Sequence, residues 1–280
     1  MLTPDPHPLR LPRILLTNDD GFEAPGLAAL TEIAETLSHE VWVVAPQHDE
    51  SGTGQSLSLH HPLRAWPRGE RRWAVGGTPG DCVALALGHF MADTKPALLL
   101  SGINAGSNLG DDVNLSGTIG AALIGLLLGV PSIAISMDCV SRDNARWDTA
   151  RAIAPKVLSH FLAEGWRKDT CLSINIPDLP ANEIGGFRWA RPDARTLGAI
   201  HVEAREDLRA HAYYWLALHD REPGPKDSSD RAVLNRGEVA VTALSLDRSA
   251  DVKAPAVMFD EWAEAGGVAA DGDMPADIDG

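Results

Sequence analysis

The sequence predicts an α/β protein built on a doubly wound sheet of three layers, with a β-hairpin excursion near the C-terminus. Two observations predict this class. Short apolar runs alternate with longer amphipathic segments over the first two thirds of the 280 residues, and polar loops follow several of the runs. Repetition of strand, helix and strand is typical of a parallel sheet with helices on both faces.

The expected strands are short, mostly apolar runs that end at polar or glycine residues, a pattern typical of strands buried on both faces. They lie at 14–16, 41–44, 97–100, 132–136, 172–176 and 239–244. The expected helices are longer segments with apolar residues at helical spacing. They lie at 25–38, 81–90, 117–128 and 147–161. Pro25 suits a first helical turn, where no backbone N–H is required.

The organisation of the chain follows from where this alternation stops. After about Arg188 the charges are scattered, and the aromatic residues Tyr213, Tyr214 and Trp215 precede a Pro-Gly linker at 222–225. We expect a long hairpin there that serves subunit contact. The predicted regions are an N-terminal extension (1–11), a core that carries the chemistry (12–189), the excursion with the last strand (190–250), and a C-terminal helix with an acidic tail (251–280).

Composition excludes some classes of partner. The formal net charge is −15, from 24 basic and 39 acidic side chains, whereas a nucleic-acid polymer needs a basic footprint. A small anion can still bind if a metal ion or backbone amides supply a local positive field. No run approaches the roughly 18 apolar residues that span a bilayer, and no secretory signal precedes the first strand. We therefore expect a cytoplasmic protein with no membrane partner.

The three cysteines lie far apart in the sequence, at Cys82, Cys139 and Cys171. Without paired spacing they fit reduced thiols better than a disulfide framework or a zinc site. We expect none of them to be catalytic.

An acid pair stands directly after the first predicted strand, in the run Asn18-Asp19-Asp20-Gly21. Two unit charges about 4 Å apart repel by roughly 4 kcal/mol at an effective dielectric near 20. The pair therefore predicts either a bound cation or a shared proton, although a polar turn that closes a strand remains the alternative. In a continuing strand the two carboxylates would point to opposite faces, so both reach one ion only if the chain turns, which Gly21 permits.

Polar loops after two further strands offer oxygen ligands. In open α/β sheets the ligand lies outside the carboxyl ends of the strands. Ser51 follows the second strand and Asn104 follows the run at 97–100, so we expect both near the acid pair. An oxygen set without paired cysteine or histidine favours Mg²⁺ or Mn²⁺ over Zn²⁺. A partial shell of this kind leaves positions for water and a substrate oxygen, as a catalytic metal site requires.

A phosphate site is predicted where the helix at 117–128 begins. Ser116, Gly117 and Thr118 open this helix, whose free N–H groups and dipole suit an anion. Gly117 allows close approach of the backbone. Simpler roles remain open, because Ser116 and Thr118 can be ordinary N-cap residues and asparagines in a glycine-rich loop, such as Asn104 and Asn108, are often turn formers.

Other polar and aromatic residues near these loops also have two interpretations. Asp111 and Asp112 can form a second acid site, but capping or loop hydrogen bonds are the favoured interpretation. The loop histidines can serve as proton donors or be merely solvated. The tryptophans fit a core or an interface better than a base-stacking platform. These histidines and tryptophans are His48, His60, His61, Trp42, Trp66 and Trp73.

Five sequence blocks resemble the survival protein E (SurE) family of nucleotidases, and they occur in the order and spacing of that family over roughly residues 12 to 185. They are ILLTNDDGFEAPGL from Ile14, VAP from Val44, SGTGQS from Ser51, GTPGDCV from Gly77, and SGINAGSNLGDD from Ser101 through to SGT at Ser116. The run NIPDLP from Asn175 extends the likeness, and NRG from Asn235 continues it more weakly.

The resemblance implies a Rossmann-like core and a metal-dependent phosphomonoesterase that acts on nucleoside 5′- and 3′-monophosphates, in some members also on polyphosphate. It implies one divalent ion per subunit, Mg²⁺ or Mn²⁺ (or Ca²⁺ in crystals), and a homodimer or homotetramer. Carried over residue by residue, the metal ligands are Asp19, Asp20, Ser51 and Asn104. The phosphate contacts are Asn108, Ser116, Gly117 and Thr118, with Asn18 as a neighbour in the first loop.

The resulting hypothesis is metal-dependent hydrolysis of a phosphate monoester, with Asp19 and Asp20 as the catalytic residues. Asp19 is the candidate to assist the attacking water, and the amides of Gly117 and Thr118 would stabilise the equatorial charge. A phospho-aspartate intermediate is the mechanistic rival. A nucleotide-binding module without turnover is the alternative function. A signalling receiver also carries an acid pair after its first strand, but no lysine stands at a matching strand end in this sequence.

Overall fold

The computed structural model describes residues 10–139, 141–193, 197–220 and 228–249. Its strands are β1 (Ile14–Thr17), β2 (Val41–Pro46), β3 (Ala65–Gly69), β4 (Arg72–Val75), β5 (Leu98–Ala105), β6 (Ser132–Met137), β7 (Thr170–Ile176), β8 (Phe187–Trp189), β9 (Leu197–Glu206), β10 (Ala212–Asp220) and β11 (Val239–Ser245). Its α-helices are α1 (Pro25–Leu37), α2 (Pro79–Leu85), α3 (Gly117–Leu127), α4 (Trp147–Glu164) and α5 (Asp230–Asn235).

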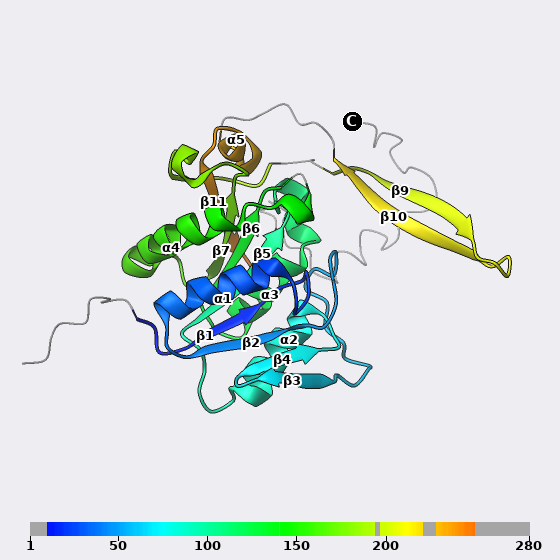
Figure 1. Ribbon diagram of the computed structural model, residues 1–280, viewed down its shortest axis with the longest axis horizontal. Coiled ribbons are helices and arrows are strands. Elements are labelled where there is room, and N and C mark those ends of the chain that lie inside the picture. Colours follow the sequence, from blue (N-terminus) through cyan, green and yellow to red (C-terminus); the bar gives the residue numbers. More distant parts are fainter. Residues whose placement is uncertain (1–9, 140, 194–196, 221–227, 250–280) are drawn as a thin grey trace, which may run out of the picture. The chain divides into compact units, whose positions relative to one another are not determined.

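The described residues form one large sheet and a separate two-stranded hairpin (Figure 1). The strand order of the large sheet is β3-β4-β2-β1-β5-β6-β7-β11-β8. Its centre is parallel, while β3 pairs antiparallel with β4 and β11 pairs antiparallel with β7. Helices α1 and α4 cover one face, and α2 and α3 cover the other. The predicted α/β class, with a doubly wound sheet and a hairpin excursion, is confirmed.

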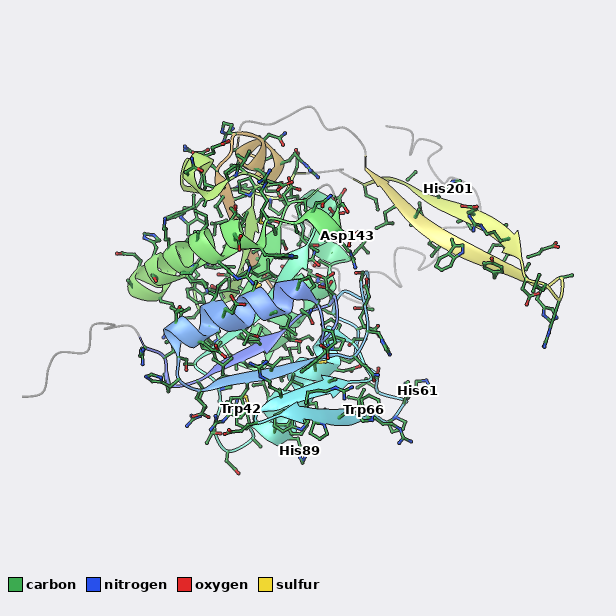
Figure 2. All side chains as sticks on the ribbon, viewed as in Figure 1. Trp42, His61, Trp66, His89, Asp143 and His201 are labelled. Atoms are coloured by element: carbon green, nitrogen blue, oxygen red, sulfur yellow. The ribbon has the colours of Figure 1, made fainter. Side chains whose placement is uncertain are left out.

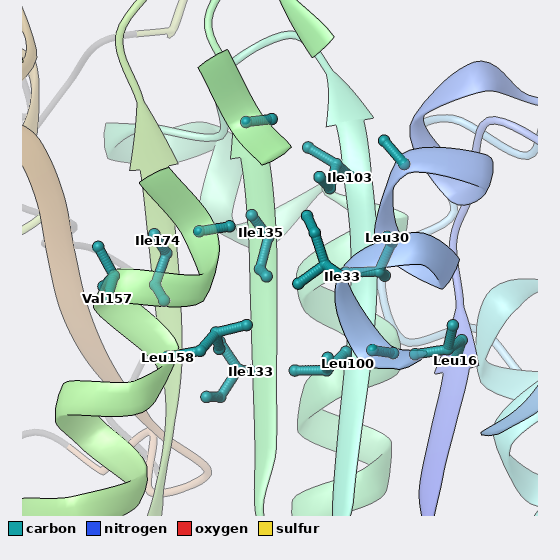
Figure 3. Packing of buried hydrophobic residues seen from close by; sticks show 14 of the residues in the cluster. Leu16, Leu30, Ile33, Leu100, Ile103, Ile133, Ile135, Val157, Leu158 and Ile174 are labelled. Atoms are coloured by element: carbon teal, nitrogen blue, oxygen red, sulfur yellow. The ribbon is translucent and has the colours of Figure 1, made fainter. Parts of the chain in front are cut away.

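Uninterrupted apolar runs explain why the central strands are buried on both faces. In β1, Ile14 and Leu16 belong to the cluster under α1 and α4, and Leu15 belongs to the cluster on the other face. Figure 3 shows the first cluster, where Leu30 of α1 and Leu158 of α4 lie against side chains of the central strands. Successive residues of a strand point to opposite faces, so an uninterrupted apolar run fills both layers of the core.

The sequence patterns located half of these strands and helices within three residues at both ends and missed four. The strands β3 and β4, the short strand β8 and the helix α5 were not expected. Strand β3 has the sequence AWPRG, which contains Pro67 and lacks an apolar run. Proline is tolerated there because β3 is an edge strand, where one row of N–H groups needs no partner. The helix expected at 81–90 begins at Pro79 and continues from Ala86 as a π-helical turn.

The excursion consists of the hairpin β9–β10, whose register pairs Ile200 with Leu218 and Val202 with Leu216. All four side chains are exposed, Leu216 to 71%. The excursion begins and ends at one place, because the N–H of Asp230 donates to the carbonyl oxygen of Arg191 at 2.9 Å. Strand β11 then returns to the main sheet between β7 and β8.

Two of the predicted regions fall largely outside the described residues. Of the N-terminal extension only residues 10 and 11 are described, and the predicted C-terminal helix and acidic tail at 251–280 are not described. The four regional boundaries therefore stay predictions. Within the described part of the chain, none of the helices has the length and apolar character needed to cross a membrane.

Candidate functional site

The acid pair lies in a tight turn at the carboxyl end of β1. Gly21 has φ of +102°, a backbone conformation that L side chains rarely adopt. The side-chain amide of Asn18 donates to the carbonyl oxygen of Gly21 at 2.8 Å and closes the turn. Asn18 is fully buried and Asp19 is 3% exposed. The turn that both carboxylates need in order to face one ion is therefore present, and Asn18 shapes it.

Asp19 is in direct contact with the first turn of α3. The Thr118 hydroxyl donates a hydrogen bond to Asp19 Oδ1, and a Cβ atom added to Gly117 would lie 2.9 Å from Asp19 Cβ. Burial raises the pKa of Asp19 to about 6, the Thr118 hydrogen bond opposes this rise, and the charge of Asp20 adds to it. A helix N-terminus favours a nearby negative charge. The Asp19 carboxylate therefore lies against the same first turn of α3 that is predicted to bind phosphate.

Asp20 faces the next strand along the sheet. Its Oδ2 accepts the backbone N–H of Ala105, at the end of β5, at 2.9 Å. Its Oδ1 is buried without a hydrogen-bond partner, and Arg142 Nη1 lies 3.4 Å away. Burial raises the pKa of Asp20, while the Ala105 hydrogen bond and the Arg142 charge oppose the rise.

Asn104 is the residue next to this contact. A β-bulge between Gly102 and Asn104 interrupts the pairing of β5 with β6, and bulges next to sites commonly redirect a side chain. The side-chain nitrogen of Asn104 donates to the carbonyl oxygen of Gly106 at 2.8 Å. The amide oxygen is therefore the atom that Asn104 can offer to a cation.

Ser51 belongs to a small polar network in the loop after β2. Its N–H and hydroxyl both donate to Asp49 Oδ1, at 2.9 and 2.6 Å. Arg142 Nη2 donates to Ser51 Oγ at 3.1 Å, and Arg142 Nη1 donates to Asp49 Oδ2. Because the same guanidinium lies beside Asp20, it connects Ser51 with the acid pair.

The predicted phosphate residues take up different positions. Ser116 is the N-cap of α3, and its Oγ accepts the N–H of Ile119 at 3.1 Å, so the capping role left open by the sequence is real. The Thr118 hydroxyl is engaged by Asp19. Asn108 is 8% exposed and its side-chain nitrogen donates to Ser136 Oγ. The backbone N–H of Thr118 also hydrogen-bonds to Asp19, so the N–H of Gly117 is the main donor that this end of α3 can give a phosphate.

The secondary candidates follow their simpler interpretations. Asp111 Oδ2 accepts the N–H of Leu197, which begins β9, so this acid forms a loop hydrogen bond. Trp73 stacks between Trp42 and Phe90, as expected of a packed cluster. Within the described residues, none of the three loop histidines hydrogen-bonds to a predicted ligand; His61 is labelled in Figure 2. All three cysteines are free, and burial raises the pKa of Cys171 to about 12.

Sequence reasoning missed two residues of this site, Asp49 and Arg142. Asp49 lies in the loop that supplied Ser51, two positions before it, so the loop itself was the available signal. Arg142 comes from the short turn at Arg142–Asn144, whose middle residue, Asp143, is labelled in Figure 2. Its partners lie more than 90 residues away in sequence, and no local pattern indicates such a contact.

The donor chemistry of this corner fits a hard divalent ion. Two carboxylates, a hydroxyl and an amide oxygen are ligands that Mg²⁺ and Mn²⁺ accept. The buried, unpartnered Oδ1 of Asp20 is an atom that such an ion would satisfy, since buried polar atoms normally have partners. No group of three or more His, Cys, Asp or Glu side chains in the described chain is placed to share a metal, so an ion here would rely on neutral oxygens as well.

Fold and site together define a class: a doubly wound α/β protein with an oxygen-rich acid-pair site against a helix N-terminus, suited to a divalent ion and a phosphate. The chain belongs to the family described as Survival protein SurE, whose family model matches residues 14–199.

Its relatives agree with this assignment. The chain is 48% identical over 240 residues to 5′-nucleotidase SurE 1 of Burkholderia lata, covering 85% of this chain and 92% of the relative. It is 42% identical to 5′-nucleotidase SurE of Parvibaculum lavamentivorans, covering 84% and 86%. The SurE protein crystal structure from Aquifex aeolicus matches with a TM-score of 0.73 and 37% identity, covering 85% of this chain and 95% of that one.

Proposed function

We propose that this protein is a divalent-metal-dependent 5′-nucleotidase, which hydrolyses nucleoside 5′-monophosphates to nucleoside and phosphate. The names of its relatives support this activity. The proposed metal ligands are Asp19, Asp20, Ser51 and Asn104, with Mg²⁺ or Mn²⁺ as the ion. The proposed phosphate donors are the first N–H groups of α3, together with Asn108.

The observation that carries the proposal is the contact between Asp19 and the start of α3. Gly117 packs directly on Asp19, and Thr118 donates to it. A phosphate bound to the N–H of Gly117 would therefore lie next to a buried acid pair. Two anions meet there only if a cation lies between them, which is why the proposal includes a metal.

The residues of the chain divide the proposed work as follows. A bound divalent ion supplies Lewis-acid polarisation of a phosphoryl oxygen and a lowered pKa for water. Gly117 presents its N–H group to the charge that develops on the phosphoryl oxygens, whereas the N–H of Thr118, expected from the sequence to share this role, is engaged by Asp19. Asp19, whose Oδ1 is fixed by Thr118, is the candidate to orient and assist the attacking water. Attack by an aspartate, with a phospho-aspartate intermediate, is the alternative route.

Several finer properties are part of the proposal as well. By resemblance to the family we propose activity on 3′-monophosphates and on polyphosphate, a homodimer or homotetramer, and a cytoplasmic location. The exposed apolar side chains of the hairpin β9–β10 support self-association, since contiguous apolar patches on a surface mark interaction sites.

The decisive experiment measures inorganic phosphate release from AMP and GMP with Mg²⁺, with Mn²⁺ and with EDTA. We expect metal-dependent release that EDTA abolishes, and 3′-AMP and polyphosphate in the same panel test the wider substrate range. Nucleotide binding without phosphate release would instead support a binding module. Release that persists in EDTA would refute the metal requirement.

A further inference from the structure

Arg142 contacts three groups at the proposed metal site through one guanidinium. Nη1 donates to Asp49 Oδ2 and lies 3.4 Å from Asp20 Oδ1, while Nη2 donates to Ser51 Oγ at 3.1 Å. Asp20 and Ser51 are two of the four proposed ligands. The planar fork of arginine suits this arrangement, because its donors are held at a fixed spacing that can bridge neighbouring oxygens.

The surroundings of this contact distinguish it from an ordinary surface ion pair. The Asp20 side chain is only 6% exposed, whereas the Arg142 side chain is 52% exposed. The buried Oδ1 that faces Arg142 has no hydrogen-bond partner. The guanidinium is therefore the one cationic group beside this oxygen among the described residues, and it belongs to a side chain that is half exposed to solvent.

We propose that Arg142 is a built-in competitor for the divalent ion, and that it sets the metal affinity of the site. This inference rests on the proposed function, because it requires Asp20 and Ser51 to be metal ligands. A divalent ion and a guanidinium cannot both occupy the space against Asp20 Oδ1 and Ser51 Oγ, since two cations at that separation repel. Ion binding therefore displaces the fork from Asp20 and Ser51.

Asp49 determines where the displaced arginine remains. It accepts a hydrogen bond from Arg142 Nη1 and accepts two more from Ser51. Arg142 can thus stay hydrogen-bonded to Asp49 at the edge of the site, while Ser51 Oγ becomes available as a ligand of the ion. The exchange needs only rotation of exposed side chains, so it costs little beyond the lost ion pair.

The first test is the Mn²⁺ affinity of the full-length chain, measured by isothermal titration calorimetry. Arg142→Met should bind Mn²⁺ about two- to fivefold more tightly than the wild type, the range expected for removing a partly exposed competing ion pair. Arg146→Met is the matched control. Its side chain is 51% exposed and pairs with Asp178 at 3.0 Å, so the same change of charge there should leave Mn²⁺ affinity within about twofold.

The second test observes displacement directly and does not depend on activity. In ¹⁵N-labelled protein, the Arg142 Nε–H signal is identified by its absence from Arg142→Met and followed during titration with Mg²⁺. We expect the signal to shift and its solvent exchange to accelerate as Mg²⁺ binds. Arg142→Lys, which keeps a charge but loses the fork, should bind Mn²⁺ more tightly than the wild type.

The outcomes separate this inference from the proposed function. If the wild type binds no Mn²⁺ or Mg²⁺, the proposed metal site is wrong and the inference falls with it. If the wild type binds the ion while Arg142→Met binds it equally or more weakly, the metal site stands and the competition is refuted. An Arg142 signal that does not respond to bound Mg²⁺ also refutes the competition.

Discussion

The acid-pair corner and the hairpin β9–β10 depart from the ordinary rule of burial in opposite directions. At the corner, Asp19 is 3% exposed although aspartate is rarely buried. On the hairpin, Ile200 is 59% exposed and Leu216 71% exposed, although such side chains usually lie inside. Both departures cost free energy in the isolated chain, and both are relieved by adding a second component.

The difference lies in what that component must be. A buried carboxylate beside a second carboxylate is relieved by positive charge, so the corner calls for a cation. Exposed aliphatic side chains are relieved by apolar surface, so the hairpin calls for another protein surface. The comparison teaches that a buried charge or an exposed apolar side chain indicates the chemistry of the partner that would stabilise it. The following experiments test this for the corner and for the hairpin.

The largest effect is expected at the corner, for Asp20→Asn. The loss of a charged ligand should lower kcat/KM for AMP by roughly 1,000-fold, the order seen when one group that stabilises transition-state charge is removed. Circular dichroism should show an intact fold. Asp169→Asn is the control, because Asp169 is exposed and pairs with nearby Arg167. Mn²⁺-stimulated turnover that survives in Asp20→Asn would end the assignment.

A smaller effect concerns stability without metal. The pKa of Asp19 is about 6 in the folded protein, against 3.8 for an unperturbed aspartate. Between these two pH values the folded state therefore binds more protons than the unfolded state. Its contribution to stability is present below pH 4 and is lost as the pH rises through 6. In EDTA, urea unfolding of Asp19→Asn and wild type should diverge by up to about 3 kcal/mol between pH 4 and pH 7, in favour of the variant. A stability difference between the variant and the wild type that does not change with pH would contradict the explanation that burial raises the pKa of Asp19.

The smallest effect is expected at the hairpin. Replacing Ile200 and Leu216 together by lysine should weaken self-association at least about tenfold, because lysine at the core of an interface carries an uncompensated charge. Sedimentation velocity over a concentration series measures this change. Leu208→Lys, in the turn of the same hairpin, is the control and should sediment like the wild type. A wild type that remains monomeric throughout would refute self-association through this face.

The sequence was most informative where a local pattern determines a local structure. Apolar runs located the central strands, and Gly21 after two aspartates indicated that the chain can turn there, as it does with a positive φ. It was least informative where two loops meet. Arg142 contacts Asp49 and Ser51 across more than 90 residues, and only the assembled sheet edge brings these loops together. Strand β3 was missed for a different reason. It is mostly exposed and pairs with β4 at the edge of the sheet, so it has no apolar run that would indicate a strand.

The closed base of the excursion has a consequence for how this protein can vary. Backbone hydrogen bonds join Arg191 to Ser228 and Asp230 to Arg191, and the Asp230 carboxylate also accepts the N–H groups of Gly110 and Asp193. The polypeptide is thus clasped before the hairpin departs and after it returns. An arm attached through such a clasp can be lengthened or shortened without a change in the large sheet, because the chain is already fixed on both sides of the hairpin.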